Sequence, residues 1–244
     1  MRKRLNLRKI WVFNVLLIGF AVGQATLSWA IRDVRPTLGI LPDLPQQQAA
    51  DALAFGDQQF LYRYLALTLQ NAGDNGGRVT PLKNYDYAKV VAWLRLLDGL
   101  DHNSHWVIAM ANGYFGQTQT IEDVEPIVRF MQENVAYRPE LKWPWLVNAI
   151  HLSRHRLKND WLALDAARQL ATYDYPEMNA ASLQMPALVL DDLQQYESAK
   201  YEIEALRGLA GRTFRPEEKA WMAAFVDLMV SQSEAQNGGL QSQK

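Results

Sequence analysis

The sequence predicts an all-α fold, a stack of helical hairpins that follows one apolar N-terminal helix. Three observations lead to this prediction. An uncharged run of 22 residues, 10–31, lies near the start of the chain, and the apolar side chains after it recur at helical spacing. Pro139, Pro176 and Pro216, each within two residues of an aromatic side chain, are 37 and 40 residues apart. Because proline cannot continue a helix, these prolines mark the boundaries of successive two-helix units.

Composition limits the classes of protein to which the chain can belong. It has 244 residues, of which 49% are hydrophobic and 21% charged, enough apolar material for one buried core. Residues 1–9 carry five of the 25 basic residues and none of the 26 acidic ones, so 20 basic and 26 acidic residues remain. This acidic remainder disfavours a nucleic-acid partner, which needs a clustered basic surface. The absence of cysteine excludes disulfides, cysteine-based zinc sites and thiol catalysis.

The uncharged run 10–31 is long enough to cross a membrane, since a helix rises about 1.5 Å per residue and the hydrocarbon layer is roughly 30 Å thick. Five basic residues before it, against Arg32 and Arg35 shortly after it, predict a cytoplasmic N-terminus at 1–9. A cleaved signal peptide is the alternative, because small residues follow the first half of the run. The run continues through Trp29, which favours a retained signal anchor, that is, a transmembrane helix.

With the N-terminus in the cytoplasm, the domain beyond this helix is expected outside it. The absence of an Asn-x-Ser/Thr sequon favours a bacterial periplasm over a eukaryotic secretory lumen. The predicted location is therefore the bacterial inner membrane, crossed once. Residues 32–48 hold Pro36, Pro42 and Pro45 and predict an extended spacer. The helical domain, called the repeat domain below, is predicted to cover 49–232.

The first strongly patterned helix follows Asp57, which stands in the place of an N-cap. Its apolar side chains cover a broad surface, so we expect this helix to be buried on more than one side. These side chains are Phe60, Leu61, Tyr64, Leu65 and Leu67 to Leu69. The glycine-rich stretch 71–81 lacks the pattern of a phosphate-binding or calcium-binding loop and is interpreted as a plain connection.

Helix-start signals recur along the repeat domain. Asp86 is expected to cap the next helix, and Asn103 or Ser104 the helix after it. Thr120 stands three residues before Asp123, which is the spacing of a capping box for a third helix.

The stretch 142–176 predicts a hairpin of two short helices. Asn159 or Asp160 is expected to cap the second helix, and Pro176 to end it. Leu170 lies in the apolar stripe of the second helix and is expected to be buried. Later helices are predicted at 179–193, interrupted by Pro186, at 196–209 and from Pro216 onward, before a disordered tail at 233–244.

Hairpins of this kind recur with a period in the high thirties. Their first helices start near Asn103, Lys142, Asn179 and Pro216, which gives periods of 39, 37 and 37 residues. These periods, the aromatic and proline at each boundary, and small residues such as Ala163, Ala166 and Ala199 together resemble the tetratricopeptide repeat (TPR) family. The resemblance covers roughly 57–232. It implies a TPR-like α-solenoid of stacked hairpins with a groove for a peptide or protein.

Two histidine pairs are candidates for metal ligands, His102 with His105 and His151 with His155. No third ligand stands at a suitable spacing. Leu152 also takes the place where a metalloprotease motif has glutamate. We therefore predict no metal ligand.

Glu197 is the candidate residue for an enzymatic alternative, because helical lytic transglycosylases use a glutamate on a curved helical scaffold. The residues around Glu197 fit helix packing better. No catalytic or cofactor-binding residue is predicted, and the protein is not expected to be an enzyme.

Three residues are predicted to bind a partner at the repeat domain. Trp143 and Trp145 flank Pro144 at a helix start, and His151 follows on the same helix. Most tryptophans of a helical repeat fill gaps between hairpins, but large aromatic side chains also dominate binding hot spots.

The apolar N-terminal helix offers a second predicted contact surface. Gly19 and Gly23 form a Gly-x-x-x-Gly pair that lets another helix approach closely. Asn14 and Gln24 carry amides that are costly against lipid tails unless a neighbouring helix bonds them. We therefore expect this helix to pack among other transmembrane helices.

The function predicted from these observations is that of a membrane-anchored, periplasm-facing TPR-like adaptor or scaffold, an accessory or assembly subunit of a membrane protein complex. Its expected partners are membrane proteins at the transmembrane helix, a protein or peptide at the repeat domain, and the lipid bilayer, with no cofactor and no nucleic acid. The alternative is a periplasmic hydrolase or glycan-binding protein on a curved helical scaffold.

Overall fold

The computed structural model describes residues 7–30, 39–74, 79–173, 175–207 and 214–241, and every regular element in these ranges is a helix. An isolated antiparallel bridge joins Asp74 to Val79 at the plain connection predicted there. The predicted all-α class is confirmed. Residues 1–6, most of the predicted spacer (31–38), the loop residues 75–78, and residues 174, 208–213 and 242–244 lie outside the described part of the chain.

The chain divides into two compact units, 1–39 and 40–244. The first unit contains α1 (Leu7–Ala30), whose segment Trp11–Trp29 is long and apolar enough to cross a membrane. The predicted helix of membrane-spanning length is therefore present. The direction in which it would cross a membrane, and the membrane itself, stay predictions.

The second unit is a succession of helices joined by short connections. Its α-helices are α2 (Gln47–Ala54), α3 (Gln58–Gln70), α4 (Tyr87–Leu100), α5 (Trp106–Gly113), α6 (Val124–Tyr137), α7 (Pro139–Lys142), α8 (Pro144–His151), α9 (Asp160–Ala171), α10 (Ala180–Leu183), α11 (Met185–Asp192), α12 (Tyr196–Arg207) and α13 (Pro216–Gln241). Three 3₁₀ turns, η1 (Leu82–Asn84), η2 (Phe115–Gln117) and η3 (Ile121–Asp123), and one π-helical turn, η4 (Leu152–Leu157), complete it.

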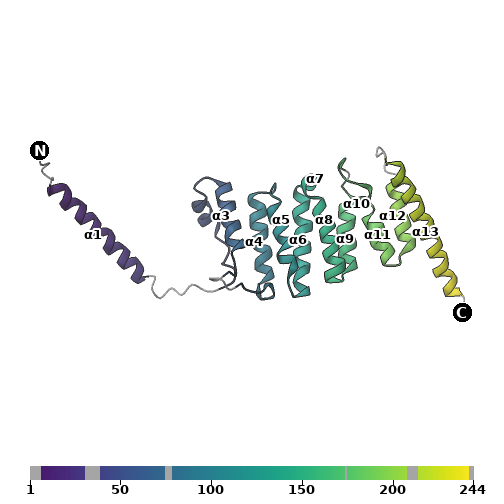
Figure 1. Ribbon diagram of the computed structural model, residues 1–244, viewed down its shortest axis with the longest axis horizontal. Helices are drawn as coiled ribbons and strands as arrows, with labels where there is room; N and C mark the ends of the chain where they lie inside the picture. Colours follow the sequence, from purple (N-terminus) through teal and green to yellow (C-terminus); the bar gives the residue numbers. More distant parts are fainter. Residues whose placement is uncertain (1–6, 31–38, 75–78, 174, 208–213, 242–244) are drawn as a thin grey trace. The chain divides into compact units, whose positions relative to one another are not determined.

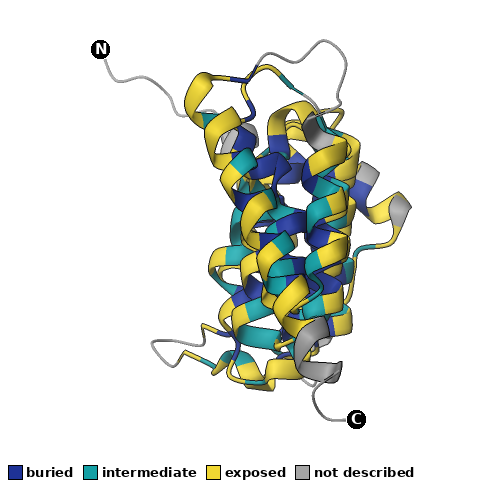
Figure 2. Ribbon diagram, turned by 90° about the vertical axis from the view of Figure 1, so that its right-hand side faces the viewer, coloured by how far each residue is buried: buried dark blue, intermediate teal, exposed yellow. Residues whose placement is uncertain are grey.

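The longer helices of this unit lie side by side in one row, in chain order (Figure 1). Each packs on the next, most extensively α8 on α9, α9 on α11, α11 on α12 and α12 on α13. In the first half of the row, α4 also contacts α6 and α5 contacts α8. Viewed from the α13 end, buried residues gather where helices face one another, and exposed residues cover the outside (Figure 2).

Most predicted helix starts are confirmed by side-chain caps. Asp57 accepts hydrogen bonds from the N–H groups of Gln59 and Phe60, and Asp86 accepts one from Lys89. Asn159 caps α9 through Leu162 N–H at 3.0 Å, and Asn179 caps α10 through Ser182 N–H at 2.9 Å. Each cap satisfies a backbone donor that the first helical turn would otherwise leave free.

The predicted capping box at Thr120 is wrong. Residues 121–123 form the 3₁₀ turn η3, and α6 begins only at Val124 with no side-chain cap. Pro126 explains the late start, because proline is tolerated in the first turn of a helix but not farther inside it. Pro216 begins α13, as predicted, whereas the single helix predicted at 179–193 is divided into α10 and α11, with Pro186 in the first turn of α11.

The expectation that the helix after Asp57 is buried on more than one side is also wrong for the single chain. Leu61, Leu65 and Leu69 of α3 are buried, but Phe60 and Tyr64 are half exposed. The main helix contacts of α3 run to α2 and α4, and its side with Phe60, Tyr64 and Leu67 stays exposed.

The C-terminal helix is longer than expected. The structure continues α13 to Gln241, through most of the predicted tail at 233–244. Ser233, Glu234, Ala235 and Gln236 extend a helix that has already started, because propagation is far easier than nucleation, and the helix continues through Gly238 and Gly239 although each glycine costs about 1 kcal/mol in a helix interior.

Candidate functional site

An open groove lies between α10 and α11 on one side and the start of α13 on the other, with a volume of about 550 Å³. Cavities of this size hold small ligands or short peptide segments. Its lining residues are Asn179, Ala180, Ala181, Gln184, Leu188, Arg215, Glu217, Glu218 and Trp221. We call it the α10–α13 groove.

Trp221 forms the aromatic wall of the groove. Its side chain stacks on Phe225 one helical turn later, with ring centroids 5.0 Å apart, while Phe225 itself is buried. Trp221 remains 39% exposed, so it presents a supported aromatic surface. Large supported aromatic side chains are typical anchors of binding sites.

The polar rim of the groove is held by interactions around Arg215. Glu218 accepts a hydrogen bond from Arg215 N–H at 2.8 Å and a second from its guanidinium at 3.2 Å. The backbone hydrogen bond is the main cause that lowers the pKa of Glu218, and the guanidinium adds to it. Glu217 lies 3.3 Å from the same guanidinium. Two carboxylates against one guanidinium leave this rim with a net negative charge.

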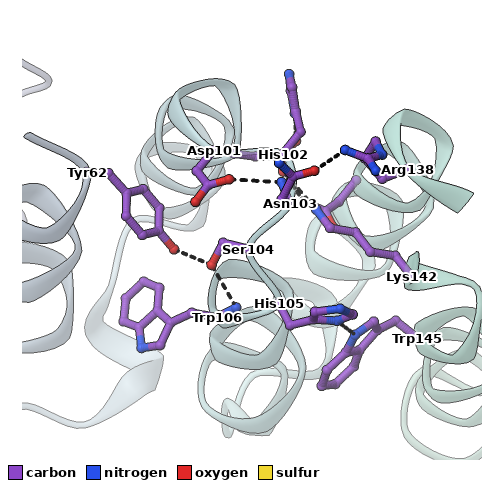
Figure 3. Close-up of polar contacts among 12 residues, drawn as sticks. Tyr62, Asp101, His102, Asn103, Ser104, His105, Trp106, Arg138, Lys142 and Trp145 are labelled. Atoms are coloured by element: carbon purple, nitrogen blue, oxygen red, sulfur yellow. Dashed lines mark hydrogen bonds and ion pairs between the residues drawn. The ribbon is translucent and has the colours of Figure 1, made fainter. Parts of the chain in front are cut away.

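A second polar feature lies between α4, α6 and α7, and three of its four residues are buried. Lys142, at the end of α7, has no exposed surface, and its Nζ lies 3.2 Å from Asp98 Oδ1. Asn134 of α6 donates to the same oxygen at 2.5 Å, and His102 donates from Nδ1 to Asp98 Oδ2 at 3.1 Å. We call these four residues the Lys142 cluster; Figure 3 shows Lys142 and His102 converging from different elements.

A small cavity of about 140 Å³ adjoins the Lys142 cluster. Tyr137 stacks on His102 at its edge, with centroids 4.5 Å apart, and Arg95 forms an ion pair with Glu133 beside it. Asn134 Oδ1 is buried without a hydrogen-bond partner in the described part of the chain. The amide cannot be reversed to remove this defect, because its oxygen would then face the acceptor-only carboxylate of Asp98.

The contacts of the Lys142 cluster connect α4, α6 and α7. Three donors surround the carboxylate of Asp98, so its charge is compensated inside the protein. Sequence reasoning missed this cluster. The available signal was that Asp98 falls on the apolar stripe of α4, four residues after Leu94 and seven after Val91.

The turn between α4 and α5 ties neighbouring elements together (Figure 3). Ser104 Oγ lies 2.6 Å from the Tyr62 hydroxyl of α3 and accepts from Trp106 N–H at 3.1 Å. Trp145 of α8 donates from Nε1 to His105 Nδ1 at 3.1 Å. Trp145 is therefore placed in an internal contact between hairpins.

The other predicted partner-binding residues of the repeat domain take different positions. Trp143 is half-buried and packs against the core. His151 is exposed, and its ring lies 4.6 Å from that of His155. Among the described residues no group of three or more His, Asp or Glu side chains is arranged to hold a metal ion.

Glu197 is exposed on α12 and accepts a hydrogen bond from Ser233 Oγ of α13 at 2.8 Å. This contact joins two neighbouring helices. No described feature around Glu197 marks it as an acid catalyst.

The predicted contact residues of α1 are Asn14, Gly19, Gly23 and Gln24, and all are exposed within the single chain. Gly19 and Gly23 have no atom within 4 Å of the position that a Cβ would take. Thr26 on the same helix donates to the carbonyl groups of Val22 and Gly23, so its hydroxyl needs no external partner.

Comparison of the chain with protein-family models, with curated proteins and with solved structures finds no match.

Proposed function

We propose that this protein is a membrane-anchored adaptor of the TPR-like α-solenoid type, with its repeat domain in the bacterial periplasm and its α10–α13 groove bound to a segment of a partner protein. The observation that carries this proposal is the groove itself, with Trp221 as a supported aromatic wall. The row of consecutive helical hairpins supports the solenoid, and the length and apolarity of α1 support the anchor.

The groove also favours a chemical class of partner segment. Trp221, Leu188 and the alanines of α10 offer an apolar floor and wall, whereas the rim around Arg215 carries a net negative charge. A peptide segment with one apolar anchor and a positive charge complements both features.

The chain contains no cysteine, so a single introduced cysteine can carry a photoreactive cross-linker at one chosen position. Ala181→Cys places it in the groove, and Ala136→Cys places it on exposed surface of α6 as the matched control. In intact membranes, we expect Ala181→Cys to give a discrete protein adduct that Ala136→Cys does not give.

A second variant tests the groove without a cross-linker. Ala181→Arg fills the groove and adds a positive charge, so it should abolish co-purification of the adduct partner while the unfolding temperature stays unchanged. Equal adducts at both cysteine positions, or full partner recovery with Ala181→Arg, would refute binding in the groove.

A further inference from the structure

The outer side of α3 is apolar although no described helix covers it. Phe60, Tyr64 and Leu67 are spaced four and three residues apart and so share one side of the helix, where they are 50%, 50% and 56% exposed. Phe55, in the turn before α3, is 87% exposed. We call these four residues the α3 face.

Two further observations set this face apart from ordinary surface. Phe55 adopts a left-handed conformation with φ of 48°, a strained position in which glycine or asparagine is usual. Among the 13 residues of α3 only Arg63 is charged. Depletion of charge together with aromatic residues and arginine is the composition of a protein interface.

The two ends of the helix row differ in this respect. The terminal repeats of a helical array need a polar outer surface to remain soluble. The last helix, α13, exposes Trp221 and Leu228 but surrounds them with the exposed charges Glu217, Lys219, Asp227 and Glu234. The α3 face carries no charge, and the sequence pattern of α3 is that of a helix buried on two sides.

We propose that the α3 face binds the α3 face of a second copy of this chain. Composition favours a like partner, because the α3 face carries no charge with which to select a charged protein, and the apolar face of a second copy matches it. A lipid surface is disfavoured, because helices that lie on membranes combine apolar residues with several lysines or arginines. In a two-fold pair, Arg63 of one copy can lie over Tyr64 of the other as a cation–π contact.

The area of the α3 face is that of a weak dimer, which anchoring of both copies in one membrane would strengthen. Each of the four side chains exposes on the order of 100 Å², which gives roughly 800 Å² for the two copies together, below the 1,200–2,000 Å² of stable soluble complexes. Confinement of both copies to one membrane raises their effective concentration and offsets this deficit. This step rests on the proposed anchoring by α1, whereas the face itself does not.

Disulfide formation by single-cysteine variants tests the pairing in the full chain. Under mild oxidation in membranes, Tyr64→Cys should give a covalent dimer at least tenfold more readily than Tyr201→Cys, since only the former lies where two copies meet. Tyr201 is the matched control because it is a tyrosine that is 70% exposed on α12. Equal dimer yields at the two positions would show random collision and overturn the proposal.

A second variant separates the α3 face from the anchor. Leu67→Glu combined with Tyr64→Cys should lower the dimer yield about tenfold, because two buried carboxylates would face each other. Replacing α1 by a poly-leucine helix should leave the yield of Tyr64→Cys unchanged. An unchanged yield with Leu67→Glu would overturn the pairing. An environment-sensitive dye can also be attached to the thiol of the Tyr64→Cys variant. If its emission is blue-shifted, which indicates burial, although no dimer forms, the face binds another occupant and the proposal is overturned.

The failure of this inference can be told apart from failure of the proposed anchoring. Resistance to alkaline carbonate extraction reports whether α1 anchors the chain, independently of any dimer. If the chain is extracted, sedimentation equilibrium of the detergent-free protein at high concentration tests the α3 face alone. A monomer there at all concentrations would overturn the proposal.

Discussion

The helices around Lys142 and the helices around Trp221 belong to the same row but pack differently. In the first region α4 reaches α6 and α5 reaches α8, and the Lys142 cluster fills the junction with compensated charges. In the second, the extensive contacts run from α9 to α11, α11 to α12 and α12 to α13, and a groove of about 550 Å³ stays open beside α10, α11 and α13. The region around Lys142 is therefore closed by a polar cluster, whereas the region around Trp221 has an open groove.

The largest expected effect comes from breaking the closed region. Lys142→Met removes the cation from Asp98 and leaves a buried carboxylate, so we expect the free energy of unfolding to fall by about 3–5 kcal/mol. Urea denaturation measures it. The double variant Asp98→Leu with Lys142→Met removes both charges and should recover much of the loss, and a single-variant loss below about 1 kcal/mol would show that the pair contributes nothing.

Leu170 tests how much the packing of α9 between the two regions contributes to stability. It is fully buried in α9, which packs on α8 on one side and α11 on the other. Leu170→Ala should lower the free energy of unfolding by about 2–5 kcal/mol, because a cavity replaces the side chain. Trp161→Ala on the exposed side of the same helix is the control and should change it by about 0.5 kcal/mol or less.

The cap of α9 is expected to have a smaller effect. Asn159→Ala removes the acceptor for Leu162 N–H and should cost about 1 kcal/mol. Asn159→Asp keeps an acceptor and should retain most of the stability. Thermal unfolding distinguishes the two variants, and equal losses would show that the side-chain cap is not what matters.

The smallest effect is expected at the rim of the groove and depends on pH. The native pKa of Glu218 lies below its usual value near 4.3, so its contribution to stability is present above that pH. The contribution is lost as pH falls through the lowered native pKa. The stability difference between the unmodified chain and Glu218→Gln should therefore disappear in acid, and a difference that persists would mean that the carboxylate charge is not its source.

How far the sequence could predict these regions depends on the range of the interactions. Asp57, Asp86, Asn159 and Asn179 act on backbone groups within three residues, so their roles could be predicted from short patterns. The first turn of α13 followed in the same way from Pro216, whereas Pro186 was expected to interrupt a helix and instead stands in the first turn of α11.

The Lys142 cluster could not be predicted in this way. Asp98 and Lys142 are 44 residues apart, and their pairing depends on how three helices pack. The π-helical turn η4 was likewise missed, since Leu152 to Leu157 carries no proline or glycine to mark it. The prediction for α3 failed in another way. The sequence pattern predicted burial on more than one side, but within one chain Phe60, Tyr64 and Leu67 stay exposed.

The separation of 44 residues between Asp98 and Lys142 also has a consequence for the order of folding. A contact of that range forms only after α4, α6 and α7 have docked, so this block should fold and unfold as a single cooperative unit. The long-range polar contacts of α11 to α13, such as Ser233 to Glu197, are more exposed than the pair of Asp98 and Lys142, so these hairpins should open first and exchange their amide hydrogens faster than α4 and α6. The end of the row that contains the groove is therefore expected to unfold locally most easily. A ligand bound in the groove would slow this local unfolding.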